Sequence, residues 1–116
     1  MKSLGIHLIV ELWDCNFSKL NDSDYIAKVM VEAAEFSGAT VLNSVFQNFN
    51  PQGTSGVVII AESHLTIHSW PEHLYAAIDL FTCGSKVDPW KALEYLEKAF
   101  EAKEIEIIDF FRGVRR

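Results

Sequence analysis

Two strand-like segments follow one another in the middle of this chain with almost nothing between them. The first, residues 56–60, is a continuous aliphatic run of the kind found in buried strands. The second, residues 64–70, alternates in polarity. A strand there has two different faces. One face carries His64, Thr66, His68 and Trp70, and the opposite, apolar face carries Leu65 and Ile67. No Gly, Asn or Pro marks a relaxed turn between Glu62 and Ser63. We therefore expect two neighbouring strands in a sheet with one buried face and one imidazole-bearing face.

The remaining elements follow from the same periodicities. With the two segments above, strands are predicted over residues 3–13, 40–49, 55–62, 64–70, 75–81 and 104–111. Polar capping residues at 21–24 begin an amphipathic helix that Gly38 ends, and Asp88 with Pro89 begins a second one. The basic tail from Arg112 is expected to fray. This order predicts an α+β fold, a two-layer α/β sandwich whose mainly antiparallel sheet has both helices packed on one face.

Length and charge limit the remaining possibilities. A chain of 116 residues is enough for one compact domain, so residues 1–116 are taken as a single unit. The net charge of −6 argues against a nucleic-acid partner, and no apolar run reaches the length of a membrane helix. Without a recognisable leader, we expect a cytoplasmic protein in which Cys15 and Cys83 are thiols.

A family resemblance is carried by long ordered blocks. The segment Glu62–Glu72, the upstream Gly53–Val57 and the downstream Ala77–Gly84 resemble the processing site of the pyruvoyl-dependent S-adenosylmethionine decarboxylases, in their short bacterial and archaeal form. The beginning of the chain and residues 87–92 are also similar, so the likeness covers nearly all of it. The resemblance implies homodimers in which each active site is shared between the two subunits.

The same resemblance implies a self-processing enzyme. The chain would cleave itself between Glu62 and Ser63, into residues 1–62 (the β chain) and residues 63–116 (the α chain). Ser63 would become a covalent pyruvoyl cofactor, whose carbonyl forms a Schiff base with the amine of S-adenosylmethionine and draws electrons as CO2 leaves. The product, decarboxylated S-adenosylmethionine, is the aminopropyl donor of spermidine biosynthesis.

Individual roles are carried over position by position. His68 matches the proton donor and acceptor of processing, and Ser55 matches a residue that supports processing. Cys83 matches the proton donor in catalysis. For the substrate, Phe49 matches a ring that stacks on adenine, and Glu72 matches the carboxylate that binds the ribose hydroxyls. The pocket is expected to be completed from either subunit by Leu8 and Glu11.

Three other functions stay open on the residues alone. A related pyruvoyl enzyme could act on arginine, although Phe49 and Glu72 suit a nucleoside better. A regulatory member could bind without being processed, against which the presence of Ser63, His68 and Cys83 counts. A metal site could use His64, His68, His73 and Cys83, but no closely spaced ligand pair such as Cys-x-x-Cys is present, and we expect no metal.

Overall fold

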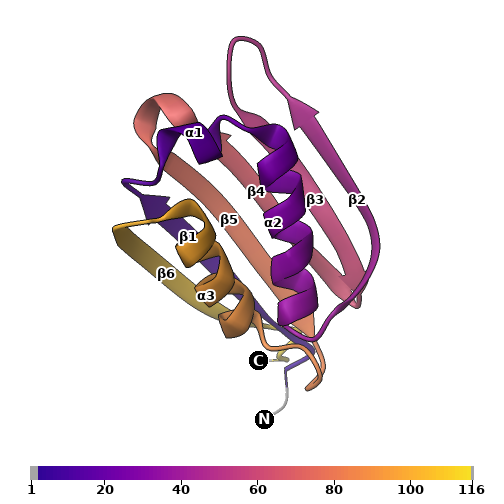
Figure 1. Cartoon of the computed structure of the whole chain (residues 1–116). Helices are drawn as coiled ribbons and strands as arrows, with labels where there is room; N and C mark the ends of the chain where they lie inside the picture. The colour runs from indigo at the N-terminus through magenta and orange to yellow at the C-terminus, as the bar shows by residue number, and fades with distance from the viewer. Residues whose placement is uncertain (1–2, 116) are drawn as a thin grey trace.

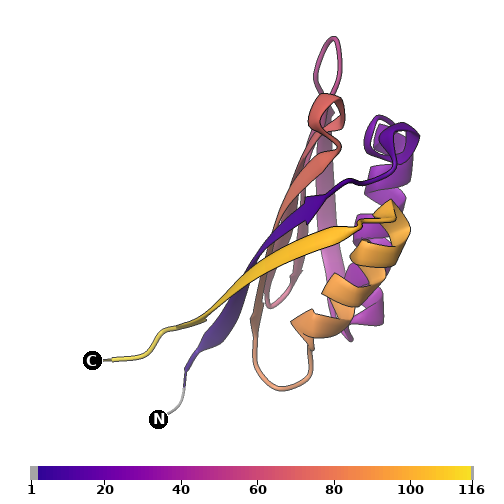
Figure 2. The ribbon, with the colours of Figure 1, turned by 90° about the vertical axis from the view of Figure 1, so that its left-hand side faces the viewer.

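An antiparallel sheet of six strands forms one layer of the protein, and helices form the other. The structure is a computed structural model that describes residues 3–115. The strands lie in the order β2-β3-β4-β5-β1-β6, and every neighbouring pair is antiparallel. Both long helices pack on the same side of the sheet (Figures 1 and 2). The α+β sandwich predicted from the sequence is therefore confirmed.

The boundaries of the elements agree with the predicted ones to within two residues. In chain order the elements are β1 (Gly5–Trp13), α1 (Phe17–Leu20), α2 (Ser23–Phe36), β2 (Thr40–Asn48), β3 (Thr54–Ala61), β4 (Ser63–Trp70), η1 (Pro71–His73), β5 (Tyr75–Cys83), α3 (Pro89–Phe100) and β6 (Glu104–Arg112). The short helices α1 and η1 were not predicted, because four and three residues are too few to show a helical period.

Both long helices begin at the expected capping residues. The Asp22 carboxylate accepts a hydrogen bond from the Tyr25 amide at 3.0 Å, and the Asp88 carboxylate accepts one from the Trp90 amide at 3.0 Å. Helix α2 ends just before Gly38, whose φ of 96° lies in the region that glycine adopts without strain. These caps satisfy backbone groups that the helices cannot pair internally.

The hydrophobic core lies between the sheet and the helices. Alternate residues of β1, β4 and β5 point toward the helices and are buried. The largest fully buried side chains include Phe100 of α3, Met30 of α2 and Leu65 of β4. The opposite set of alternate residues forms the other surface of the sheet, which is called the open face below.

No element within residues 3–115 covers the open face, as the edge-on view shows (Figure 2). Apolar side chains are nevertheless exposed there. Ile9 of β1 pairs with Ile108 of β6, and Val45 of β2 pairs with Val57 of β3. An uncovered apolar sheet surface of this kind is typical of an interaction site.

The end of the chain differs from the prediction. Arg112 is the last residue of β6 rather than the start of a frayed tail. Its carbonyl accepts a hydrogen bond from the Leu4 amide at 2.9 Å, and its guanidinium lies 4.7 Å from the centre of the Phe81 ring.

Among the helices of residues 3–115, none combines the length and apolar character needed to cross a membrane.

Candidate active site

The first group of expected site residues lies where β3 and β4 pair. Ser55 is directly opposite His68 in the antiparallel register, and the Ser55 hydroxyl is hydrogen-bonded to Nδ1 of the imidazole. The Phe49 ring lies 5.7 Å from the His68 ring, between centroids. Phe49 itself is exposed and is the first residue of the loop that joins β2 and β3. Serine, imidazole and aromatic ring are thus brought together from three separate segments.

An aromatic row supports His68 from the other side. The Trp70 ring lies 4.0 Å from the His68 ring, and it stacks on Tyr75 of β5 at 5.2 Å. Tyr75 stacks in turn on Trp13 of β1 at 4.3 Å. These rings stand on the open face, where no helix packs on them, so they hold the imidazole through contacts made by the sheet alone.

Glu11 anchors this row. The Tyr75 hydroxyl donates a hydrogen bond to the Glu11 carboxylate. Burial, followed by this hydrogen bond, raises the pKa of Tyr75 to about 12, so the phenol keeps its proton at neutral pH. Glu11 also lies in the same cross-strand row as His68, with Ala77 between them. The residue expected to line the substrate pocket is therefore engaged with Tyr75 in this structure.

Glu72 belongs to the same end of the sheet. It is an exposed residue of η1, which follows β4 directly. In Figure 1, η1 and the loop between β2 and β3 lie at the same end of the molecule. Glu72 and Phe49 thus belong to two connections at the same end of the sheet.

The second group of expected residues lies at the other end of β4. Glu62 forms the turn between β3 and β4, and Ser63 is the first residue of β4. The φ of Ser63 is 109°, a left-handed value that a residue with a side chain rarely adopts. The expectation that no relaxed turn joins Glu62 to Ser63 is confirmed. The peptide group before Ser63 is thus held in a strained backbone.

Cys83 lies at the same end, as the last residue of β5. Its thiol is free and half-buried, and the preceding residue, Thr82, is paired with Ser63. Gly5 of β1 lies opposite Cys83. A side chain at Gly5 would place its Cβ 2.7 Å from the Thr82 carbonyl oxygen and 3.2 Å from the Cys83 sulfur, so the close approach of β1 requires glycine here.

A polar network between the two groups was not predicted from the sequence. Asp79 of β5 accepts a hydrogen bond from the Thr66 hydroxyl at 3.1 Å and pairs with Nε2 of His7 at 2.9 Å. His7 stacks on Phe81 at 5.5 Å, and His64 meets Phe81 edge-on at 5.6 Å. The sequence of β5 could have indicated this network, because Asp79 is the one charged residue in an otherwise uncharged strand.

The two groups are far apart within one protomer. Ser63 and His68 lie on the same strand, and a strand rises roughly 3.3 Å per residue, so positions 63 and 68 are separated by about 16 Å. A proton transfer needs heavy atoms about 3 Å apart. The His68 imidazole of one chain therefore cannot serve the Ser63 of that same chain.

One expected pocket residue does not lie at the site. Leu8 is 0% exposed and points into the core under the helices, so the expectation that it contacts substrate is wrong. Even and odd positions of a strand face opposite ways, and Leu8 has the parity of the core. Within residues 3–115, no group of three His, Cys, Asp or Glu side chains is placed to bind an ion.

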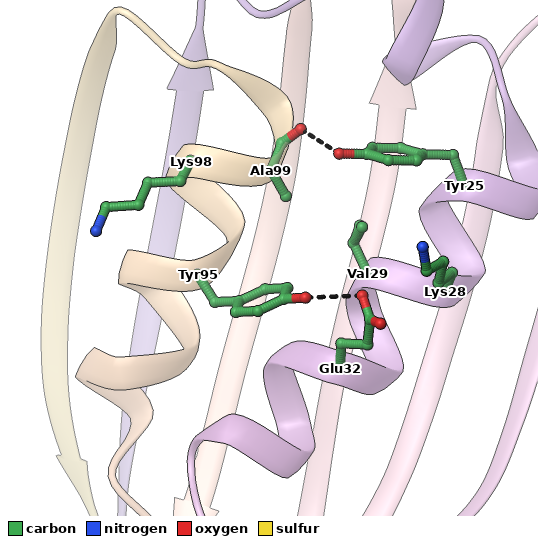
Figure 3. A pocket seen from close by; sticks show the side chains of 7 residues that line it. All are labelled: Tyr25, Lys28, Val29, Glu32, Tyr95, Lys98 and Ala99. Atoms are coloured by element: carbon green, nitrogen blue, oxygen red, sulfur yellow. Dashed lines mark hydrogen bonds between the residues drawn. The ribbon is translucent and has the colours of Figure 1, made fainter.

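Two hollows in the surface differ in what surrounds them. One, of about 380 Å³, lies on the sheet beside the first group and is lined by Val45, Gln47, Ser55, Gly56, Val57, Thr66 and Ile67. The other, of about 360 Å³, lies between α2 and α3 (Figure 3). There the hydroxyls of Tyr25 and Tyr95 are already bonded, to the Ala99 carbonyl and the Glu32 carboxylate, each at 2.7 Å. The helix groove contains none of the expected site residues.

The fold is shared with a known enzyme. The crystal structure of the adenosylmethionine decarboxylase from Aquifex aeolicus superimposes with a TM-score of 0.93 at 31% sequence identity, over 100% of this chain and 96% of that one. These features place the protein among the carboxy-lyases with an α+β sandwich fold.

Sequence comparison then identifies the family. The sequence model of S-adenosylmethionine decarboxylase matches residues 6–113. The S-adenosylmethionine decarboxylase proenzymes of Thermosipho melanesiensis and Thermotoga maritima are each 55% identical over 97% of this chain and 87% of their own length. A Bacillus cereus proenzyme of the same name matches equally well. The chain belongs to the S-adenosylmethionine decarboxylase family, and none of these relatives is named for arginine.

Proposed function

We propose that this protein is a proenzyme that cleaves itself between Glu62 and Ser63 and then decarboxylates S-adenosylmethionine. The observation that carries the proposal is the left-handed backbone of Ser63, directly after Glu62 in a turn and beside the strand that ends in the free thiol of Cys83. Strain at a peptide bond favours reactions that release it. The word proenzyme in the names of the relatives supports the same reading.

The cleavage uses groups of the protein and one water molecule. The Ser63 hydroxyl oxygen attacks the Glu62 carbonyl carbon, and the bond from that carbon to the Ser63 nitrogen breaks, which leaves an ester and a free amine. Loss of the Ser63 α-proton then expels the Glu62 carboxylate. The dehydroalanine that remains tautomerises to an imine, and water displaces ammonia to leave a pyruvoyl group at position 63. The products are residues 1–62 and residues 63–116.

A second copy of the chain completes the site. His68 lies about 16 Å from Ser63 along β4, and Ser55 of β3 is directly opposite His68, so a single chain cannot bring either to the scissile bond. In a two-fold dimer, each patch of surface meets its counterpart in the reverse direction. Two open faces packed in this way would place His68 of the partner subunit at Ser63, and would do so twice.

The open face has the character needed for such an interface. Ile9, Val45 and Ile108 are exposed on it without any covering element within residues 3–115. Pairing two copies would remove this apolar surface from water, which is the main favourable contribution to association. The polar network of Asp79, His7 and Thr66 lies in the middle of the same face, where paired hydrogen bonds limit the cost of burial.

The surroundings of position 63 fit the cofactor of the family. Ser63 supplies its carbon atoms, Cys83 offers a thiol near it, and the buried Thr82 hydroxyl on the paired strand has no partner within residues 3–115. Once formed, a pyruvoyl group supplies an electron sink for the carboxylate that leaves. In this proposal Cys83 delivers the proton that replaces it. Phe49 stacks on the adenine, and the Glu72 carboxylate accepts hydrogen bonds from the ribose hydroxyls.

The product would be the aminopropyl donor for spermidine synthesis. We also propose that the protein works in the cytoplasm, in keeping with its two free thiols, Cys15 and Cys83. Neither proposal alters the chemistry of the site.

An intact mass spectrum of the denatured protein tests the cleavage. We expect two fragments that meet at Glu62 and Ser63, the second blocked at its N-terminus by the pyruvoyl group. The Ser63→Ala variant should stay whole, whereas Ser85→Ala, at an exposed serine outside the site, should be cleaved like the unmodified chain. Release of labelled CO2 from carboxyl-labelled S-adenosylmethionine, present in the unmodified protein and absent in Ser63→Ala, tests the second half. An uncleaved unmodified chain that never releases CO2 would refute the proposal.

A further inference from the structure

The Thr82 hydroxyl is buried without a hydrogen-bond partner. Thr82 is 1% exposed, and its Oγ1 is the one buried side-chain oxygen or nitrogen within residues 3–115 that has none. Buried polar groups in folded proteins are nearly always paired, because an unpaired one has lost its bonds to water without replacement. An exception of this kind calls for a reason.

Packing does not require a hydroxyl at this position. The helix-facing side chains of β5 are otherwise apolar, namely Ala76, Ile78 and Leu80. Valine has almost the same shape as threonine and would fill the same space without burying a polar atom. The hydroxyl therefore weakens the fold where an apolar side chain would strengthen it, which is the pattern expected of a functional residue.

The sheet register places this hydroxyl next to Ser63. Thr82 of β5 is directly opposite Ser63 of β4. Side chains directly opposite one another in an antiparallel pair have Cβ atoms about 4.5–5.5 Å apart, so the two hydroxyls are neighbours, although they are not bonded to each other in this structure. The unpaired group thus lies beside the residue whose backbone is strained and whose hydroxyl must attack the Glu62 carbonyl carbon.

We propose that Thr82 is a positioning residue for self-cleavage, whose hydroxyl, unpaired in the resting chain, hydrogen-bonds the Ser63 hydroxyl during the attack and holds its oxygen toward the Glu62 carbonyl carbon. The inference rests on the proposed function. A hydroxyl both donates and accepts, so the bond persists as the Ser63 oxygen loses its proton. Thr82 itself gains and loses no proton, and the covalent changes remain those of the acyl shift.

Two matched substitutions separate this role from a packing role. Thr82→Val keeps the shape and removes the hydroxyl, whereas Thr82→Ser keeps the hydroxyl and removes a methyl group. We expect Thr82→Val to cleave at least tenfold more slowly than the unmodified protein, and Thr82→Ser to stay within about threefold of it, as followed by mass spectrometry from synthesis onward.

The melting temperature of an uncleavable variant tests the effect of Thr82→Val on folding separately from its effect on cleavage. In the Ser63→Ala background no chain is cleaved, so the effect of Thr82→Val on folding is measured alone. An unpaired buried hydroxyl predicts that Ser63→Ala/Thr82→Val melts at the same temperature as Ser63→Ala or higher. A hydroxyl with a structural partner predicts a lower melting temperature. Slow cleavage combined with undiminished stability would support the positioning role.

The remaining outcomes overturn the inference. Cleavage of Thr82→Val at the unmodified rate would show that the hydroxyl is not needed, and a large fall in melting temperature would show that it serves the fold. If Thr82→Val does not fold, Thr82→Ala and Thr82→Ser form a second pair that differs only in the hydroxyl, and equal cleavage of the two would also overturn it. Failure of the proposed function is distinguishable, because the unmodified protein would then stay uncleaved.

Discussion

A shared active site predicts that two inactive variants restore one another. Ser63→Ala removes the nucleophile, and His68→Ala removes the imidazole about 16 Å away on the same strand. Each variant alone should be uncleaved or cleaved slowly, since a positioned acid or base contributes on the order of 100-fold or more to such a step. In a mixed dimer, one site combines the Ser63 of the His68→Ala chain with the His68 of the Ser63→Ala chain and is therefore intact.

The expected amount of cleavage follows from the symmetry. If the two variants are co-expressed equally and pair at random, about half of the dimers are mixed, and each mixed dimer has one intact site. About half of the His68→Ala chains should then be cleaved, and the Ser63→Ala chains should remain whole. Different affinity tags on the two chains allow intact mass spectrometry to count each separately after purification.

The double variant is the decisive control. A chain that carries both Ser63→Ala and His68→Ala, paired with an unmodified chain, leaves no intact site in a shared arrangement, so it should block cleavage of its unmodified partner. If each chain contained its own site, the unmodified chain would be cleaved normally and the single variants would not restore one another. Either result would refute the argument from the strand geometry.

Three further predictions concern pH, the aromatic row and the substrate. Burial, and then the charge of the neighbouring Asp14, raise the pKa of Cys15 from 9.0 to about 11. This shift contributes up to about 3 kcal/mol to the free energy of unfolding, which should be fully present below pH 9 and lost as the pH rises toward 11. The midpoint of urea unfolding should therefore fall over that range, and it should fall less in Cys15→Ala. A midpoint that does not change with pH would contradict the prediction. Trp70→Leu should slow cleavage and shift its pH dependence by releasing the His68 ring from its contact at 4.0 Å, whereas Trp90→Leu, at an exposed position on α3, should leave both unchanged. An unaltered pH profile for Trp70→Leu would exclude the supporting role. Glu72→Gln should raise KM for S-adenosylmethionine about tenfold or more with little effect on cleavage, because a carboxylate accepts hydrogen bonds more strongly than an amide; an unchanged KM would remove Glu72 from the ribose site.

Local periodicity was enough to predict the elements of this fold. The alternation of β4 correctly separated Leu65 and Ile67 from the imidazole face, and the capping carboxylates Asp22 and Asp88 marked both long helices. These signals depend on neighbours within a few residues, so they can be read without the tertiary structure. Leu8 was assigned to the pocket, whereas the structure buries it in the core on the helix side of β1.

Which side chains meet was decided by the sheet register. Ser55 and His68 are distant in sequence but directly opposite in the sheet, whereas Ser63 and His68 are near in sequence but lie toward opposite ends of one strand. Pairing between strands depends on how the whole sheet is assembled, so no local pattern encodes it.

The sequence by itself determined the element types, the imidazole face of β4 and the membership of a family through long ordered blocks. The tertiary structure alone decided that the site residues form two groups, that Asp79 joins His7 and Thr66 between them, and that the Thr82 hydroxyl lies unpaired opposite Ser63. The physical reason is the difference in range. Polarity patterns act along a few residues of one strand, while distances between groups depend on the rise of roughly 3.3 Å per residue and on which strands are neighbours.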